Sequence, residues 1–226
     1  MALAVETKDT TALSDAELAD MADIGVAGSA GYEFGLLSKH AEEWVLITLA
    51  HDVSSETDGP RLVGFSFCTL ERIGGTPCVL VGMASVARIS SRRAVLDALI
   101  GDQLRRAVLA FPDEDVLVGT CMLHPGAFDA FDGLAEIVPR PGHKASGEER
   151  AWARRLAKRF GADGRVDDRT FVVTGAEEPL AALDYESPDD DPEVVAYFVG
   201  LDHERGDRLI GFGWAMAEDL AARAHR

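Results

Sequence analysis

Hydrophobic residues along this chain follow two alternating patterns. Short apolar runs bounded by turn residues are typical of strands, and apolar residues spaced by three or four are typical of helices. The most apolar run is Cys78 to Val86, and its unbroken character indicates a strand that is buried on both faces. A long amphipathic helix is expected from Arg92 to Phe111, because its apolar residues recur at helical spacing until Pro112 stops it.

Further elements are expected on both sides of this strand and helix. Two Ser-x-x-Glu capping boxes, at Ser14 and at Ser146, predict helix starts. Short turns join the strands before the long helix, which indicates an antiparallel meander. The remaining elements are a helix near 34–40, strands at 43–51, 62–71, 115–122, 136–139, 169–174 and 209–214, a short helix at 125–131, a basic helix at 148–160 and a helix that begins with Asp191 and Pro192.

This order predicts a mixed α/β fold. Because a helix separates the run at 78–86 from the strand at 115–122, these two strands can lie parallel. We expect residues 1–13 to be a flexible tail and residues 14–226 to be a single domain, with a core at 14–140 and a C-terminal extension at 141–226. The strands of the extension are expected to join the same sheet, since two strands alone cannot bury themselves. The acidic segment 185–191 is expected to be an exposed loop.

Composition narrows the class of protein. The 226 residues carry a net charge of −17 and the sequence pI is about 4.6, which argues against general binding to nucleic acid or to anionic membranes. The N-terminus has no signal-peptide pattern and no apolar stretch is long enough to span a bilayer, so a cytoplasmic protein is expected. Cys68, Cys78 and Cys121 are expected to be free thiols, although Cys68 and Cys78 could face each other across a hairpin. No metal-ligand spacing occurs, so no metal site is expected.

Two places carry candidate chemistry. A cationic, hydroxyl-bearing corner made by Arg88, Ser90, Ser91, Arg92 and Arg93 lies between the apolar strand and the long helix, where a helix start offers unpaired N–H groups to an anion. The alternative is a simple connection with solvated arginines.

The second place is His124, which ends the strand at 115–122 and precedes Pro125. The end of a buried strand often presents a functional side chain. The alternative is a histidine that only ends the strand at a turn.

The order of elements over residues 14–140 resembles the GNAT superfamily of acyl-CoA-dependent N-acyltransferases. This resemblance implies a central, mostly antiparallel twisted sheet flanked by helices, whose fourth and fifth strands splay apart around the pantetheine of the cofactor. It implies an acyl-CoA, acetyl-CoA or another, with its pyrophosphate at Ser90–Arg93 beside Arg88 and its pantetheine along Ser85 and Val86. Val86-Ala87-Arg88 lies where the family often has Val-x-Pro.

The chain departs from the family at the residues that carry chemistry. The central glycine of the family's pyrophosphate turn is replaced by Val95 or Leu96. The family's Asn-x-x-Ala-x-x-x-Tyr spacing is kept, but His124 replaces the asparagine and Phe131, which has no proton to give, replaces the tyrosine. The fourth and fifth strands carry no Asp or Glu that could act as a general base.

Two functional hypotheses follow from the resemblance. The chain is an acyl-CoA-dependent N-acyltransferase that uses His124 or a bound water as base on a small-molecule or peptide amine. Alternatively, it is a catalytically inactive GNAT-fold protein that serves as a ligand-binding or protein-interaction module. The sequence does not decide whether it is an enzyme, and it leaves the acceptor and the oligomeric state open, a homo-oligomer included.

Overall fold

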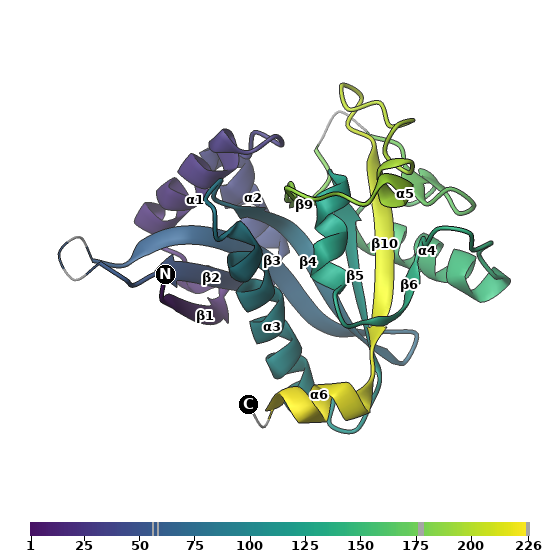
Figure 1. Ribbon diagram of the computed structural model, residues 1–226, viewed down its shortest axis with the longest axis horizontal. Helices are drawn as coiled ribbons and strands as arrows, with labels where there is room; N and C mark the ends of the chain where they lie inside the picture. Colours follow the sequence, from purple (N-terminus) through teal and green to yellow (C-terminus); the bar gives the residue numbers. More distant parts are fainter. Residues whose placement is uncertain (56, 58, 176–178, 225–226) are drawn as a thin grey trace.

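A single sheet organises the molecule. The computed structural model describes residues 1–55, 57, 59–175 and 179–224. Within them ten strands form one sheet in the order β1-β2-β3-β4-β9-β5-β10-β8-β7, and β6 pairs with β10 (Figure 1). The strands are β1 (Leu3–Asp9), β2 (Leu46–Asp52), β3 (Arg61–Ile73), β4 (Thr76–Val86), β5 (Val116–Met122), β6 (Ala135–Val138), β7 (Val166–Asp167), β8 (Val172–Val173), β9 (Leu183–Asp184) and β10 (Arg208–Ala215). The helices are η1 (Thr10–Ala12), α1 (Asp15–Ala27), α2 (Phe34–Glu43), α3 (Arg92–Ala110), η2 (Pro125–Phe131), α4 (Gly147–Arg159), α5 (Pro192–Val195) and α6 (Ala217–Ala224).

The prediction of a flexible tail at residues 1–13 is wrong. Residues 3–9 form β1, which pairs antiparallel with β2 along its whole length. Thr7 also shares a hydrogen bond with Thr48 on β2, at 2.8 Å. Leu3, Val5 and Thr7 are partly buried while Ala4 and Glu6 are exposed, which is the burial pattern of a strand with one solvated face.

The predicted meander and crossover are confirmed. Strands β1 to β4 pair antiparallel in sequence order, and β4 then pairs in parallel with β5 across the α3 crossover. The predicted fold class, a mixed α/β fold with a mostly antiparallel sheet flanked by helices, is therefore confirmed.

A bulge in β4 opens the sheet in its middle. The β3–β4 register runs from Cys68 opposite Val81 to Ser66 opposite Ala84, so Gly82 and Met83 together face one residue of β3. Bulges bend a strand and increase its twist. The parallel pairing of β4 with β5 ends at Val81, immediately before the bulge, and from there the two strands diverge.

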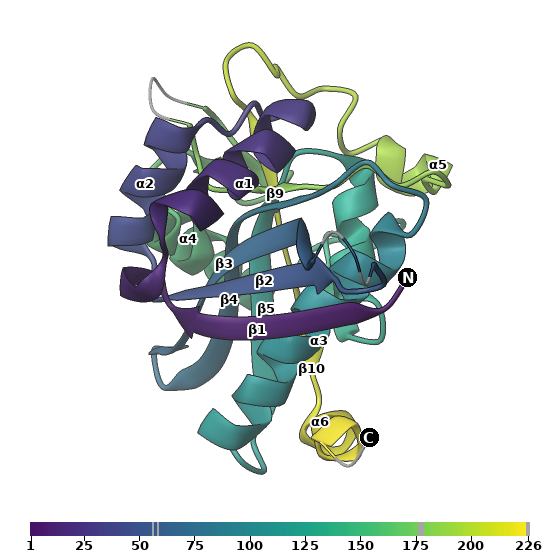
Figure 2. The same ribbon diagram turned by 90° about the vertical axis from the view of Figure 1, so that its left-hand side faces the viewer.

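Helices cover both faces of the sheet. Helices α1, α2 and α4 lie on one face, and α3, η2 and α6 lie on the other (Figure 1 and Figure 2). Both predicted capping boxes are present, at Ser14 with Glu17 and at Ser146 with Glu149. None of the helices in the described part of the chain is long and apolar enough to cross a bilayer.

The C-terminal part differs most from its sequence prediction. Its strands do join the same sheet, but the strand expected at 169–174 shrinks to Val172–Val173 and the helix after Pro192 is one turn long. The segment 185–191 is not wholly exposed, because Tyr185 is only 2% exposed. Directly before it lies β9, which the sequence did not predict.

Candidate active site and adjoining cavity

Strand β9 fills the gap between β4 and β5. It pairs in parallel with both neighbours, through Ala84 on β4 and Met122 on β5. The backbone N–H of Ala84 donates to the carbonyl of Ala182, and the N–H of Leu123 donates to the carbonyl of Leu183, both at 3.2 Å. Donors on both arms of the opening are therefore satisfied by the chain itself.

Side chains from the α1–α2 connection fix this segment in place. The Tyr32 hydroxyl donates to the Ala182 carbonyl at 2.7 Å, and the backbone N–H of Ala30 donates to the Asp184 carboxylate at 2.9 Å. Burial raises the pKa of Tyr32, so its hydroxyl stays protonated and remains a donor. Gly28 lies so close that any Cβ there would collide with the Asp184 carboxylate. The segment is thus held by contacts on several sides.

Two predicted cofactor residues lie against this strand. Ser85 pairs with Asp184 and is 1% exposed, and Val86 is 7% exposed. The empty space beside them, which Arg88 and Arg92 also line, measures only about 10 Å³. That is about the volume needed to admit one water molecule, so a pantetheine chain does not fit while β9 is in place.

Two of the three arginines of the cationic corner, Arg88 and Arg93, are paired with carboxylates. Arg88 donates to Glu186 at 2.8 Å and to the Ser29 hydroxyl at 2.9 Å, and Glu186 belongs to the same segment as β9. Ser90 is exposed, and the Ser91 hydroxyl lies 3.1 Å from the sulfur of Met1. Arg92 has no ion-pair partner among the residues that the structure describes.

Arg93 is the most strongly paired member of this corner. It contacts Asp97 at 2.8 Å and Asp129 at 2.9 Å, and it also bonds to Asp132. Partial burial acts against its charge, but the hydrogen bonds to Asp97 and Asp132 outweigh that effect and raise the pKa of Arg93. Its role in this state is to tie the start of α3 to η2.

His124 lies where the end of β5 meets the β9 segment. Its Nε2 is 3.4 Å from Asp184 Oδ1 and 3.8 Å from Glu186 Oε1. The Nε2 atom is buried and has no hydrogen-bond partner, and the same holds for the Ser85 hydroxyl. The structure thus brings His124, Ser85 and Arg88 into one region, around carboxylates of β9 that the sequence analysis missed.

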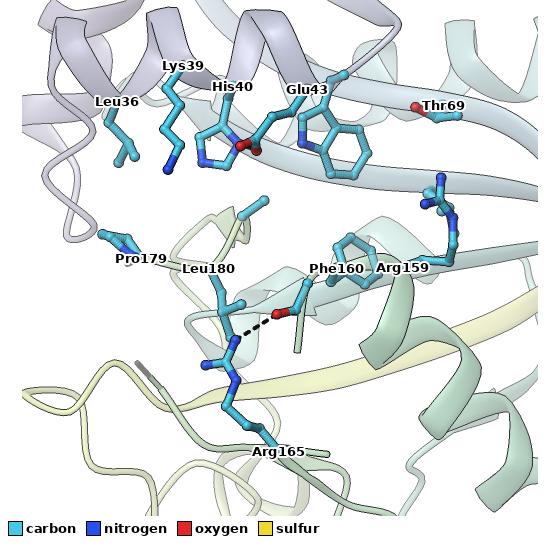
Figure 3. A pocket seen from close by; sticks show the side chains of 14 residues that line it. Leu36, Lys39, His40, Glu43, Thr69, Arg159, Phe160, Arg165, Pro179 and Leu180 are labelled. Atoms are coloured by element: carbon cyan, nitrogen blue, oxygen red, sulfur yellow. Dashed lines mark hydrogen bonds and ion pairs between the residues drawn. The ribbon is translucent and has the colours of Figure 1, made fainter. Parts of the chain in front are cut away.

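A larger cavity opens on the α1–α2 face of the sheet. Its volume is about 730 Å³, within the range typical of ligand pockets. Figure 3 shows Lys39, His40 and Glu43 of α2 on one side and Leu180, Phe160 and Arg165 on the other. No motif marked these residues in the sequence, because the lining comes from segments far apart in the chain that only the fold brings together.

An aromatic floor closes one side of this cavity. The rings of Trp44 and Phe160 lie 6.0 Å apart, centre to centre. A Cβ on Gly82 would lie 2.6 Å from the Trp44 ring, so the absence of a side chain in the β4 bulge makes room for the indole. The bulge that splays the sheet therefore also shapes the cavity.

Comparisons with known proteins give distant structural likenesses. No protein-family profile and no curated protein sequence matches the chain. The NatC complex bound to Gag peptide and CoA contains a chain with a TM-score of 0.44 and 15% identity, over 66% of this chain and 90% of that one. NAA60 of Arabidopsis thaliana in complex with a bisubstrate analogue gives 0.40 and 12%, over 64% and 91%. An acetyltransferase of Bacillus subtilis in complex with CoA gives 0.37 and 11%, over 95% and 100%.

Because these TM-scores are below 0.5, the fold is not assigned from these structures. The fold is assigned from this chain's own meander, its α3 crossover and its splayed β4 and β5, which are the features that the GNAT resemblance implies. On that topology, the chain has a divergent GNAT-type fold.

Proposed function

We propose that this protein is a catalytically inactive, ligand-binding member of the GNAT-type fold. One observation carries the proposal: backbone and side chains of residues 182–186 occupy the opening between β4 and β5. The resemblance puts the pantetheine of an acyl-CoA in that opening. A cofactor would have to displace a segment that is hydrogen-bonded to both strands.

The cost of such displacement supports the proposal. Ala182 and Leu183 are fully buried, and Tyr185 is nearly so. Exposing a buried leucine alone costs about 2 kcal/mol, and each buried polar group that loses its partner adds about 1–3 kcal/mol. The open cavity of about 730 Å³ at Trp44 and Arg165 requires no such rearrangement, so we assign ligand binding to it.

The second candidate function is that of an acyl-CoA-dependent acyltransferase, because one observation favours it. The buried, unpartnered Nε2 of His124 and the unpartnered Ser85 hydroxyl are polar atoms that a reactant could satisfy. In that case residues 182–186 would withdraw to admit acyl-CoA. His124 would then lose Asp184 as its neighbour, and a solvent-exposed imidazole would act as the base for an amine acceptor.

Calorimetric titration with acetyl-CoA and with free CoA separates these two candidates. The proposed function predicts no saturable heat up to millimolar cofactor. Micromolar binding of acetyl-CoA would contradict the proposed function. If the protein also hydrolyses the thioester slowly or transfers the acyl group to an added amine, and if His124→Ala abolishes that reaction, the protein is an acyltransferase. The His124→Ala variant must keep the thermal stability of the parent for that comparison.

A further inference from the structure

We infer that the cavity between α2, α4 and residues 179–181 binds a small organic carboxylate with an aromatic body. This inference deepens the proposed function and rests on it, since it names the ligand class of the same cavity. The argument starts from the charges that line the cavity. Lys39, Arg159 and Arg165 are cations, and Glu43 is the carboxylate among the lining residues.

Arg159 is not available to a ligand. It forms a two-pronged ion pair with Glu71, with distances of 2.7 and 2.9 Å. Its guanidinium is thereby neutralised and oriented towards β3. The charge of a bound anion would therefore be met by Arg165.

Arg165 has unused hydrogen-bonding capacity. Its guanidinium donates to the carbonyls of Gly161 at 2.8 Å and Thr174 at 3.1 Å, and it has no ion pair among the described residues. Figure 3 shows Arg165 at the edge of the cavity, with a dashed line for a hydrogen bond that its guanidinium donates. A guanidinium has five N–H donors in a fixed fork, so three remain, and its charge is met only by neutral acceptors. A carboxylate is the group that this geometry accepts best.

A second cation, Arg208, is buried near the same thiol as Arg165. Arg208 is 6% exposed, its only described hydrogen bond goes to the carbonyl of Asp207, and its Nε has no partner. Burial raises the pKa of Cys121 to about 12, and the nearby charges of Arg208 and Arg165 oppose that rise. Both guanidiniums therefore lie near the buried thiol of Cys121, and their positive charges add in that part of the interior.

The floor of the cavity defines the rest of the ligand. Trp44, Phe160 and Leu180 offer aromatic and aliphatic surface, of which Phe160 and Leu180 are 6% exposed. Aromatic rings pack on such surfaces with a gain beyond their area. An amine is disfavoured, because Arg165 would repel it and Glu43 is already 3.3 Å from His40.

Three probes of matched shape test this inference: phenylacetate, phenylacetamide and 2-phenylethylamine. Titrated into the full-length protein at low salt, phenylacetate should bind with saturation in the millimolar range or below. Phenylacetamide should bind about tenfold more weakly, which corresponds to about 1.4 kcal/mol, and the amine should show no saturation. Raising the salt concentration should weaken phenylacetate alone. Absence of phenylacetate binding, or equal or tighter binding of the amide or amine, would overturn the inference.

Variants at two positions, Arg165 and Lys39, test whether phenylacetate binds in this cavity. Arg165→Gln should weaken phenylacetate at least tenfold and leave phenylacetamide unchanged, and Arg165→Lys should recover only part of the loss. Because Arg165 also bonds to backbone carbonyls, Lys39→Glu, at an exposed position on α2, provides a second variant that reverses a charge at the edge of the cavity. Its melting temperature must match that of the parent. Lys144→Glu is the matched control, with the same change in charge at an exposed residue outside this cavity. If the Lys144 variant weakens phenylacetate binding as much as the cavity variants do, or if neither cavity variant weakens it, the anion binds elsewhere.

The failures of the two proposals are distinguishable. If acetyl-CoA binds and is turned over while phenylacetate also binds, the proposed inactivity is wrong and the anion cavity stands. If neither binds, the anion cavity is wrong and the filled opening stands.

Discussion

The positive charge of Arg93 at the start of α3, which the sequence presents as part of an anion site, is compensated by carboxylates of the protein itself. Two arginines in the first turn of a helix lie at the positive end of its dipole, which costs a few tenths of a kcal/mol to about 1 kcal/mol. The sequence left the source of compensation open. Asp129 and Asp132 provide it from η2, more than thirty residues later in the chain. Sequence spacing cannot show such a contact, because it exists only after α3 and η2 have packed.

Arg93 is therefore predicted to stabilise the fold without any bound anion. Arg93→Ala should lower the free energy of unfolding by about 1 kcal/mol, a modest value because the side chain is 39% exposed and solvent screens its ion pairs. Arg92→Ala, which breaks no described ion pair, should change it by less than about 0.5 kcal/mol. Urea denaturation of both variants measures the difference. Equal effects would mean that the carboxylates do not hold Arg93 in solution.

Asp207 gives a prediction about pH. Hydrogen bonds from Arg205 and from the N–H groups of Gly175 and Asp202 lower the pKa of this buried carboxyl to about 2. Because the folded pKa lies below the usual value of about 3.9, the carboxylate contributes stability above about pH 4, and that contribution is lost as the pH falls towards 2.

Asp207→Asn should remove this contribution. The free energy of unfolding at pH 7 should fall by about 2 kcal/mol, and its slope between pH 4 and pH 2 should become shallower. Asp189→Asn, at an exposed loop position, should leave both unchanged. A variant that keeps the parental slope would show that another group accounts for the acid sensitivity.

Elements with a strong internal pattern were predictable and β9 was not. The helix at 92–110 and the strands at 61–73 and 76–86 follow from apolar spacing, and the capped helices follow from Ser-x-x-Glu. Strand β9 is two residues long and has no period to detect. It is a strand because the bulge in β4 leaves unpaired backbone groups on both arms of an opening, and that opening exists only in the assembled sheet.

Leu183 tests how strongly β9 is held. Leu183→Ala should destabilise the protein by about 2–4 kcal/mol, because the side chain is fully buried between two strands that cannot close the gap. Leu109→Ala, at a position that is 83% exposed on α3, should be neutral. Thermal or urea unfolding provides the measurement, and a neutral Leu183 variant would indicate that the segment is only loosely held.

At the scale of the whole molecule, the sheet unites both halves of the chain. β9 lies between β4 and β5, and β10 pairs with β5 on its other side. The chain between β9 and β10 can therefore be cut while both of these strands stay paired in the sheet. The sequence predicted one sheet correctly. It predicted the meander and the parallel strand after α3, but not the position of β9 between β4 and β5.

A protease site placed at the exposed residues 188–190 is predicted to be cut without dissociating the fragments. Size-exclusion chromatography of the nicked protein should give one peak at the mass of the intact chain, and the fragments should separate only in denaturant. Release of a folded N-terminal fragment that ends at the cut would show that β10 is not required by the core.

The occupation of the β4–β5 opening is the claim on which the functional account depends. The amides of Ala84 and Leu123 report on it directly, because they donate to Ala182 and Leu183. Amide hydrogen exchange followed by NMR should find both amides strongly protected in the free protein, with rates that do not change in millimolar acetyl-CoA. Rapid exchange at both positions in the free protein, or a change in their protection when acetyl-CoA is added, would show that the segment leaves the opening and would contradict the account.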